Sequence, residues 1–326
     1  MTAEGNRYTV FESRASYVIY NVLKGRSGKV LLPANVCPIV PATVIKAGLV
    51  PAFLDISLET YEIDHDLLLR EVEKKGEYAA LIYVRTYGNL ERDLNALFQE
   101  LKQTQGPDFL IIDDRCLGIC SFSPEPSVAD LQLYSSGYSK VAELNWGGYA
   151  FLKGGLRYSR QDVIYREVAH DALLDEFNRA MADLSTIASE VCQTDWLSSE
   201  IPSVDFEDYS RQIMAMTVES LKHKEEINRI YSDTIPASVC LPDGYHNWRF
   251  NIRVADRQRL LKNIFDAGHF ASGHYANMCV NFAQKPAPNA SVLANEVVNL
   301  FNDYRFSPEK AREVAALVVK HINDND

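Results

Sequence analysis

Short apolar runs alternate with helix-like segments through the first half of the chain. Strands are predicted at residues 30–32, 52–55, 79–84, 109–114 and 131–135, and helices at residues 40–47, 66–74 and 94–104. Such alternation is typical of a parallel sheet whose two faces are covered by helices. A further apolar run at residues 149–152 is expected to pair near the strand at 131–135. The pattern therefore predicts an α/β fold with a mostly parallel central sheet.

The second half of the chain has a different pattern. Residues 161–230 are mostly helix-like, and the stretch 209–231 is long, amphipathic and charged on one face, which is typical of a helix that joins two domains. Beyond Pro236 a smaller α+β unit is predicted, with a strand at 248–254 and helices at 257–267 and 308–322. We therefore expect a large domain over residues 1–200, a connecting helical segment over 201–235 and a small C-terminal domain over 236–326.

Composition excludes several classes of protein. The 326 residues suffice to bury a sizeable core, and 47% of them are hydrophobic and 24% charged, as in ordinary globular enzymes. The net charge of -11 argues against a nucleic-acid surface. The six cysteines show no CxxC pair and no metal-like spacing with histidine, so we expect reduced thiols, no metal site and a cytoplasmic location. No signal peptide opens the chain, and no apolar run approaches the roughly 20 residues of a bilayer span, so no membrane partner is expected.

Asp114 and Lys140 lie in contexts that suit pyridoxal phosphate (PLP). Asp114 ends a short apolar strand, at the strand end where open α/β sheets bind ligands. Lys140 follows a second such strand and precedes the pair Gly147-Gly148. A lysine can hold the PLP aldehyde as a Schiff base, and a carboxylate beside the pyridine nitrogen keeps the ring protonated. Taken singly, each residue has an ordinary alternative: a solvated turn for Asp114 and a surface position for Lys140.

These residues, in this order, resemble the DegT/StrS-type sugar-nucleotide aminotransferases, PLP enzymes of the aspartate aminotransferase fold. The resemblance covers nearly the whole chain from Ser13 onward. The matching positions are Pro33, Ala47-Gly48, residues 51–56, Tyr87-Gly88 with Asp93, Asp113-Asp114, Ser135 five residues before Lys140, Gly147-Gly148, His274-Tyr275 and Asn299-Leu300. The resemblance implies a fold-type I PLP-dependent transferase with a smaller C-terminal α+β domain.

The resemblance also assigns roles to residues. Lys140 would be the Schiff-base residue and the proton shuttle, and Asp114 would contact the pyridine nitrogen. Ser135 would bind the cofactor phosphate together with backbone N–H groups at Ser13 and Arg14, which open a helix. Asn178 would reach the phosphate of the neighbouring subunit, so the resemblance implies a homodimer with shared active sites.

Four further residues are candidates for substrate contact. Arg85 and Tyr87 follow a predicted strand and face the same crevice, where they either touch cofactor or substrate or pack at the sheet edge. His274 and Tyr275 either line the site from the small domain or pack on the core. For Arg115 we expect a structural ion pair with Asp113 or Asp114 rather than substrate binding.

The sequence departs from the family pattern at four places. Cys37 stands where the family stacks an aromatic ring on the cofactor, and Leu117 stands where the family has Gln or His. Ser13-Arg14 replaces the family's Gly-Thr. Only twelve residues precede Ser13, so we expect part of the usual cover of the site to be missing.

The leading hypothesis for function is an aminotransferase that moves an amino group from an amino acid, with glutamate as the expected donor, to a keto sugar nucleotide. The substrate half of this hypothesis follows from the family resemblance alone. The main alternative is a catalytically impaired homologue that acts as a subunit or binding protein, favoured by Cys37, Leu117 and the short N-terminal segment. A third hypothesis is a PLP enzyme that catalyses another reaction or uses a non-sugar acceptor. The sequence identifies neither the sugar, the nucleotide, the carbon aminated nor the pathway.

Overall fold

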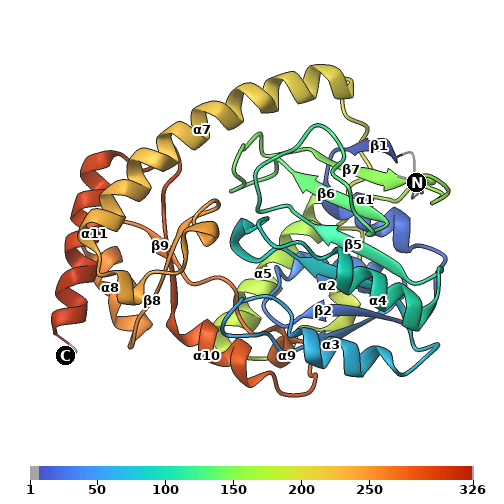
Figure 1. The fold of residues 1–326 in the computed structure, drawn as a ribbon, viewed down its shortest axis with the longest axis horizontal. Helices are drawn as coiled ribbons and strands as arrows, with labels where there is room; N and C mark the ends of the chain where they lie inside the picture. Colours follow the sequence, from blue (N-terminus) through green and yellow to red (C-terminus); the bar gives the residue numbers. More distant parts are fainter. Residues whose placement is uncertain (1–6, 325–326) are drawn as a thin grey trace.

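A seven-stranded sheet forms the centre of the large domain in the computed structural model, which describes residues 7–324 (Figure 1). Its strands are β1 (Arg7–Glu12), β2 (Lys29–Pro33), β3 (Val50–Leu54), β4 (Tyr78–Val84), β5 (Leu110–Asp114), β6 (Leu131–Ser135) and β7 (Gly148–Lys153). Across the sheet the order is β1-β7-β6-β5-β4-β2-β3. β7 runs antiparallel to both neighbours, and the other pairs are parallel. The predicted mostly parallel sheet is confirmed, whereas β1 was missed.

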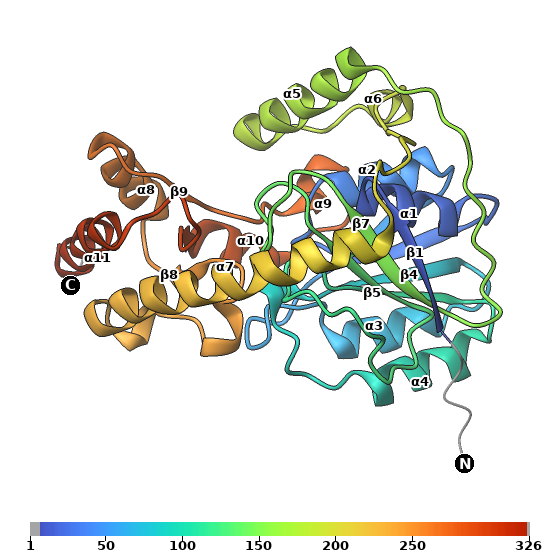
Figure 2. The same ribbon diagram turned by 90° about the horizontal axis from the view of Figure 1, so that it is seen from above.

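Helices cover both faces of this sheet, as predicted (Figure 2). The helices are α1 (Ala15–Leu23) and α2 (Ile39–Lys46) on one face and α3 (His65–Val72) and α4 (Asn95–Gln105) on the other. Successive strand residues point to opposite faces. In β2, Val30 and Leu32 therefore join the core with α1 and α2, while Leu31 joins the core with α3 and α4. Burial on both faces explains why these strands read as continuous apolar runs.

The middle of the chain is helical. It contains α5 (Glu167–Asp183), α6 (Ser189–Gln193) and the 29-residue α7 (Phe206–Thr234). At 1.5 Å per residue, α7 is about 43 Å long. Its first half packs against the large sheet through Tyr209 and Ile213, and its second half enters a separate core through Ile227 and Tyr231. The long connecting helix predicted at 209–231 is therefore present, and it joins the two cores.

The small domain is built on a three-stranded antiparallel sheet in the order β8-β10-β9. Its elements are β8 (Phe250–Arg253), α8 (Arg257–Asp266), β9 (Ala271–Ser272), β10 (Val297–Leu300) and α11 (Pro308–Asn323). Ser307 caps α11 by accepting a hydrogen bond from the Lys310 N–H at 3.4 Å. Three short 3-10 helices lie at Thr86–Gly88, Ala237–Val239 and Asp243–Tyr245.

Part of the predicted small domain packs on the large one instead. α9 (Met278–Asn281) and α10 (Pro288–Glu296) contribute Met278 and Leu293 to the large core. Asp55, at the end of β3, accepts hydrogen bonds at 2.9 Å from the N–H groups of Asn289 and Ala290 at the start of α10. A carboxylate at a helix N-terminus satisfies free donors and the helix dipole. Helices α9 and α10, which were assigned to the small domain, thus pack on the large core, and the predicted boundary at residue 236 stays a prediction.

Three general properties follow from the described residues. No helix among residues 7–324 is both long and apolar enough to cross a membrane. The six cysteines are free thiols. Over the same span, no group of three or more His, Cys, Asp or Glu side chains is arranged to hold a metal ion.

Candidate active site

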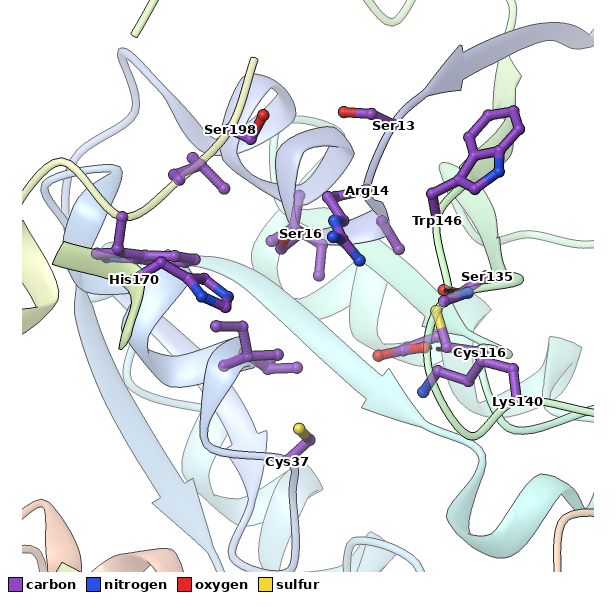
Figure 3. A pocket seen from close by; sticks show the side chains of 18 of the residues that line it. Ser13, Arg14, Ser16, Cys37, Cys116, Ser135, Lys140, Trp146, His170 and Ser198 are labelled. Atoms are coloured by element: carbon purple, nitrogen blue, oxygen red, sulfur yellow. Dashed lines mark hydrogen bonds between the residues drawn. The ribbon is translucent and has the colours of Figure 1, made fainter. Parts of the chain in front are cut away.

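A cavity of about 310 Å³ lies where β5 and β6 end and α1 begins (Figure 3). The carboxyl ends of parallel strands are the usual place for ligands in open α/β sheets. The predicted site residues in its lining are Ser13, Arg14, Asp114, Ser135, Lys140 and Tyr275. Residues that are far apart in the sequence are thus brought to one cavity.

Asp114 is buried at the end of β5. Its Oδ1 accepts a hydrogen bond from the Cys116 N–H at 3.0 Å. Burial raises the pKa of Asp114 above its ordinary value, and the hydrogen bonding of Cys116 and the charge of Lys140 oppose that rise. A buried carboxylate gains from a cationic N–H partner. Asp114 is therefore suited to accept a hydrogen bond from a protonated ring nitrogen.

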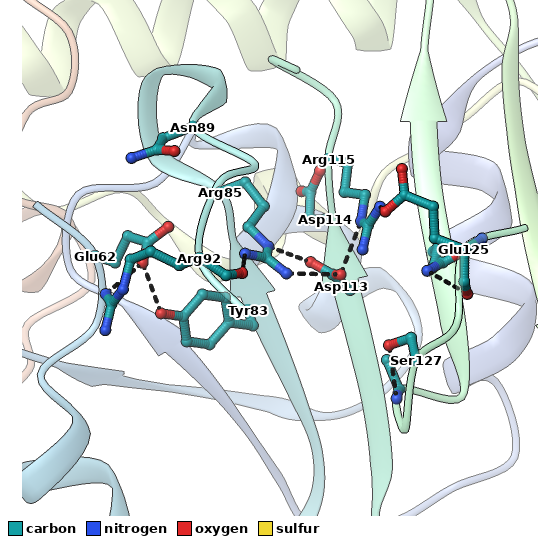
Figure 4. Close-up of polar contacts among 12 residues, drawn as sticks. Glu62, Tyr83, Arg85, Asn89, Arg92, Asp113, Asp114, Arg115, Glu125 and Ser127 are labelled. Atoms are coloured by element: carbon teal, nitrogen blue, oxygen red, sulfur yellow. Dashed lines mark hydrogen bonds and ion pairs between the residues drawn. The ribbon is translucent and has the colours of Figure 1, made fainter. Parts of the chain in front are cut away.

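Asp113 faces the opposite side of the sheet, because neighbouring strand residues alternate. Its carboxylate accepts hydrogen bonds from Arg85 at 2.7 and 3.2 Å and from Arg115 at 2.8 Å (Figure 4). Arg115 also pairs with Glu125. The prediction of a structural ion pair for Arg115 is confirmed, with Asp113 as its partner. Asp114 lines the cavity instead.

Lys140 lies in the loop between β6 and β7, and its amine points into the cavity (Figure 3). The side chain is half-buried, and among residues 7–324 it forms no hydrogen bond or ion pair. The amine is close enough to Asp114 to lower the pKa of that carboxyl. Lys140 therefore presents an available amine beside a buried carboxylate.

Hydroxyl and N–H donors gather at the other end of the cavity. The Ser13 hydroxyl is buried and has no hydrogen-bond partner within the part of the chain that the structure describes. Arg14 is the N-cap of α1, and among residues 7–324 no side chain caps this helix. The Tyr17 N–H donates to the Arg14 carbonyl at 3.1 Å, which leaves the N–H groups of Ala15 and Ser16 as the candidate donors. Ser135 Oγ accepts from the Gly137 N–H at 3.1 Å and donates to the Gly147 carbonyl at 3.4 Å. An orphaned hydroxyl beside a helix N-terminus fits a phosphate group.

Gly147 and Gly148 explain how this end is built. The Gly147 N–H donates to the Ser13 carbonyl at 2.7 Å, which fixes the strand that leads into α1. A Cβ on Gly148 would lie 2.1 Å from the Ala15 nitrogen, so only glycine permits this close approach of β7 to α1.

Two cavity residues differ from the family pattern. Cys37 and Leu117 both line the cavity, at the positions where the resemblance implies an aromatic ring and a Gln or His. Burial raises the pKa of the Cys37 thiol, which is therefore neutral. Cys116, also in the lining, has its thiol pKa raised well above the ordinary value by burial and by Asp114. Two neutral thiols are thus exposed to any ligand in this cavity.

Sequence reasoning missed one wall of the cavity. Its residues come from the helical middle and from the loop after Lys140: Trp146, Tyr165, His170, Trp196, Leu197, Ser198 and Glu200. α6 contacts α2, so this part of the chain folds back over the large domain. No local pattern marks these residues, because their place depends on that long-range packing.

Four predicted residues are absent from the cavity lining. Arg85 is engaged by Asp113, and Tyr87 is buried with its hydroxyl donating to the His274 carbonyl at 2.8 Å. These contacts agree with the packing alternative for Arg85 and Tyr87, and their contact with cofactor or substrate stays a prediction. His274 and Asn178 are exposed outside the lining, so their contacts with substrate and with a neighbouring subunit stay predictions.

No protein-family model matches the sequence, and no curated protein matches it. Solved structures match by fold. One is Spr1654 from Streptococcus pneumoniae, assigned as a sugar aminotransferase, in its PMP form, with 17% identity, a TM-score of 0.69 and coverage of 97% of this chain and 88% of that chain. A DegT DnrJ EryC1 StrS aminotransferase from Brucella abortus has 16% identity, a TM-score of 0.67 and coverage of 97% and 86%. DesI, in the presence of its TDP-sugar product, has 15% identity, a TM-score of 0.69 and coverage of 98% and 84%.

The chain has the type I fold of PLP-dependent transferases. The fold class expected from the sequence is thereby confirmed, and so is the resemblance at the level of the fold. At these identities the likeness concerns the arrangement of the chain, so residue roles rest on the geometry of the cavity.

Proposed function

We propose that this chain is a PLP-dependent aminotransferase that moves an amino group from an amino acid, with glutamate as donor, to a keto sugar nucleotide. One observation carries the proposal. The Lys140 amine, the buried Asp114 carboxylate and the unpartnered Ser13 hydroxyl converge on one cavity at the carboxyl edge of the sheet. These groups match the aldehyde, the ring nitrogen and the phosphate of PLP.

When bound, PLP would supply an electrophilic carbon for the amino group and a ring that accepts electrons from the substrate. Asp114 would accept a hydrogen bond from the ring nitrogen and hold it protonated. Ser13, Ser135 and the first turn of α1 would bind the phosphate. Lys140 Nζ would hold the aldehyde between turnovers and move a proton to and from the reacting carbon of the substrate.

Two observations support the proposed substrates: the residues that line one wall of the cavity, and the ligands of structures with the same fold. Trp146, Tyr165 and Trp196 give the cavity aromatic surfaces, and His170 and Glu200 add polar groups, a mixture typical of small-molecule sites. Spr1654 has been solved in PMP and PLP forms, and DesI with a TDP-sugar product. A homodimer with shared sites and a cytosolic location remain parts of this proposal.

An absorbance titration tests the proposal. Purified protein incubated with PLP is expected to develop a visible band that is absent in Lys140→Ala and unchanged in Lys75→Ala, which removes an exposed lysine. Addition of glutamate is expected to convert the band to the shorter-wavelength PMP form, and a keto sugar nucleotide to restore it. A band that glutamate leaves unchanged would contradict glutamate as donor.

The second candidate is a catalytically impaired homologue that serves as a subunit or binding protein. Cys37 and Leu117 in the cavity favour it, since neither supplies a stacking ring or a strong hydrogen bond. Absence of any Lys140-dependent band in the wild-type protein would support this candidate and would overturn the aminotransferase proposal.

A further inference from the structure

Ser139, the residue before Lys140, is contacted by two side chains that lie just before β8. The Trp248 indole N–H donates to the Ser139 carbonyl at 2.6 Å. The Arg249 guanidinium donates to the Ser139 hydroxyl. Ser139 has a positive φ of 57°, a conformation that non-glycine residues rarely adopt and that surrounding contacts must hold. Two side chains that lead into β8 thus fix the residue before Lys140.

Trp248 is itself held rigidly. It is 5% exposed, and its ring stacks with Tyr87 at a centroid distance of 6.4 Å and with Tyr275 at 6.0 Å. Tyr275 lines the cavity, while Tyr87 comes from the large domain. The indole therefore packs against one ring of the large domain and one ring of the cavity lining, and this packing confines its contact with Ser139.

Arg249 has an equally confined position. It is 4% exposed, its guanidinium lies 3.1 Å from the centroid of the Phe301 ring, and Asp303 is 3.6 Å away. Such a buried cation needs every available partner. The Ser139 hydroxyl is a partner outside the small domain, so the arginine ties the two domains together at this point.

The rest of the loop is held from the same side. Ser220 on α7 donates to the Val141 carbonyl at 2.5 Å. Arg305 pairs with Glu143 through two hydrogen bonds of 2.5 and 2.9 Å. By contrast, Asp114 and Ser135 are strand residues of the large sheet. The amine and the carboxylate of the cavity are therefore positioned by different parts of the molecule.

We propose that Trp248 and Arg249 are positioning residues, which hold Ser139 and thereby set the Lys140 amine against Asp114. The inference rests on the proposed function for its catalytic meaning. The competing explanation is that these contacts only join the domains. The two explanations differ in one measurable way, because a positioning role affects the Lys140 amine more than the rest of the cavity.

The test compares two cofactor forms. Covalent attachment of PLP requires Lys140, whereas PMP lacks the aldehyde and would be held by Asp114 and the groups that bind the phosphate. Trp248→Phe keeps an aromatic ring but loses the N–H, and Ser139→Ala loses only the contact with Arg249. For both variants we expect attachment of PLP to Lys140, trapped with borohydride and located by peptide mass spectrometry, to slow about three- to tenfold, as the loss of one net hydrogen bond gives. The affinity for PMP is expected to stay unchanged.

Tyr231→Phe is the matched control, since it also removes one buried donor to a main-chain carbonyl, a 2.9 Å bond to Phe301, in the small domain. It should leave attachment to Lys140 unchanged. Equal loss of PLP attachment and PMP affinity in Trp248→Phe, or no loss of either, would overturn the positioning role.

A readout without cofactor separates this inference from the proposed function. Amide hydrogen exchange of residues 137–147 in the cofactor-free protein should accelerate in Trp248→Phe and Ser139→Ala but not in Tyr231→Phe. If wild-type protein bound neither PLP nor PMP, the proposed function would fail. The exchange rates would still decide whether Trp248 and Arg249 hold the Lys140 loop, and unchanged rates would refute it.

Discussion

Burial of Asp114 costs the folded protein free energy, because its carboxylate loses water when the chain folds. The pKa of Asp114 is raised in the folded state, so the folded protein binds this proton more tightly than the unfolded chain does. The charged carboxylate therefore weakens the fold at any pH above the folded-state pKa. A cationic ring nitrogen bound in the cavity would offset this cost, so the loss of stability at Asp114 is tied to the proposed function of the cavity.

Asp114→Asn should therefore separate stability from activity. We expect the cofactor-free variant to melt at the same or a higher temperature than wild type at pH 7. The half-reaction with glutamate should fall by roughly 100-fold or more, the size typical of losing one electrostatic contact to developing charge. Calorimetry and stopped-flow absorbance measure the two effects. Asp108→Asn, at an exposed position, is the control, and a wild-type rate in Asp114→Asn would refute the assigned role.

Ser13→Ala removes the hydroxyl that has no partner in the cavity. Since an unsatisfied buried hydroxyl costs stability, we expect the free energy of unfolding to stay constant or rise by up to about 1 kcal/mol. Affinity for PMP should fall about tenfold, because hydrogen bonds to a charged phosphate are the stronger kind. Denaturant titration and equilibrium dialysis give the two quantities. Ser210→Ala on α7 serves for comparison, and an unchanged PMP affinity in Ser13→Ala would place the phosphate elsewhere.

At the scale of elements, the contact between β7 and α1 depends on Gly148. Gly148→Ala would place a Cβ 2.1 Å from the Ala15 nitrogen and push α1 away from the cavity. We expect a loss of about 1–3 kcal/mol in stability and weaker PMP binding, because the first turn of α1 moves. Gly155→Ala has a φ of 94° but no atom within 4 Å of its Cβ, so it should cost only about 1 kcal/mol and leave PMP binding intact. Equal behaviour of the two variants would show that α1 does not form the phosphate end.

Helix α7 carries a buried lysine between the two domains. Lys224 Nζ donates to the Trp248 carbonyl at 2.8 Å and to Asn302 Oδ1 at 2.7 Å. Burial lowers the pKa of Lys224 to about 7, a shift that Asp303 opposes and Arg249 reinforces. Between pH 7 and the ordinary lysine pKa, the unfolded chain therefore binds more protons than the folded protein, and this group adds stability as pH rises.

Lys224→Met removes that dependence. The stability of wild type relative to the variant should increase as pH rises above 7, with a slope of at most about 1.4 kcal/mol per pH unit. Urea unfolding at several pH values from neutral to alkaline measures the difference. A difference that is constant across this range, or that shrinks, would mean that Lys224 keeps its charge in the folded protein.

The sequence predicted the elements whose character is local. Buried strands such as β5 are apolar runs in the sequence, and they place Asp114 at a strand end. β1 was missed because it buries the charged Glu12 and exposes Tyr8, so its polarity does not follow its burial. The docking of α10 was beyond sequence reasoning, because Asp55 and Ala290 are 235 residues apart. The same holds for the cavity: Lys140 follows a strand, but Trp196 reaches the cavity only because the helical middle folds back over α2.

For the whole molecule, α5 and its flanks suggest how a second subunit would fit. α5 lies at the outside of the molecule (Figure 2). Large exposed apolar side chains occur on it and beside it: Ile164, Tyr165, Val168, Leu174 and Leu184. Exposed apolar surface of this kind commonly marks an interface. Asn178 is exposed on the same helix, so it is the residue with which the proposed sharing of sites between subunits can be tested.

Mixed dimers test whether sites are shared. In a symmetric dimer in which Asn178 serves the neighbouring cavity, combining Lys140→Ala with Asn178→Asp subunits puts both substitutions in one site and leaves the other intact. Lys140→Ala alone is expected to be inactive, and Asn178→Asp to be impaired because its carboxylate repels the phosphate. Random mixing in equal amounts makes half of the dimers mixed, and each mixed dimer has one intact site of two. About a quarter of wild-type activity should therefore return. Light scattering establishes the dimer, and activity is measured after co-refolding. If activity never exceeds that of the diluted Asn178→Asp protein, each subunit completes its own cavity and Asn178 has no role in its neighbour's.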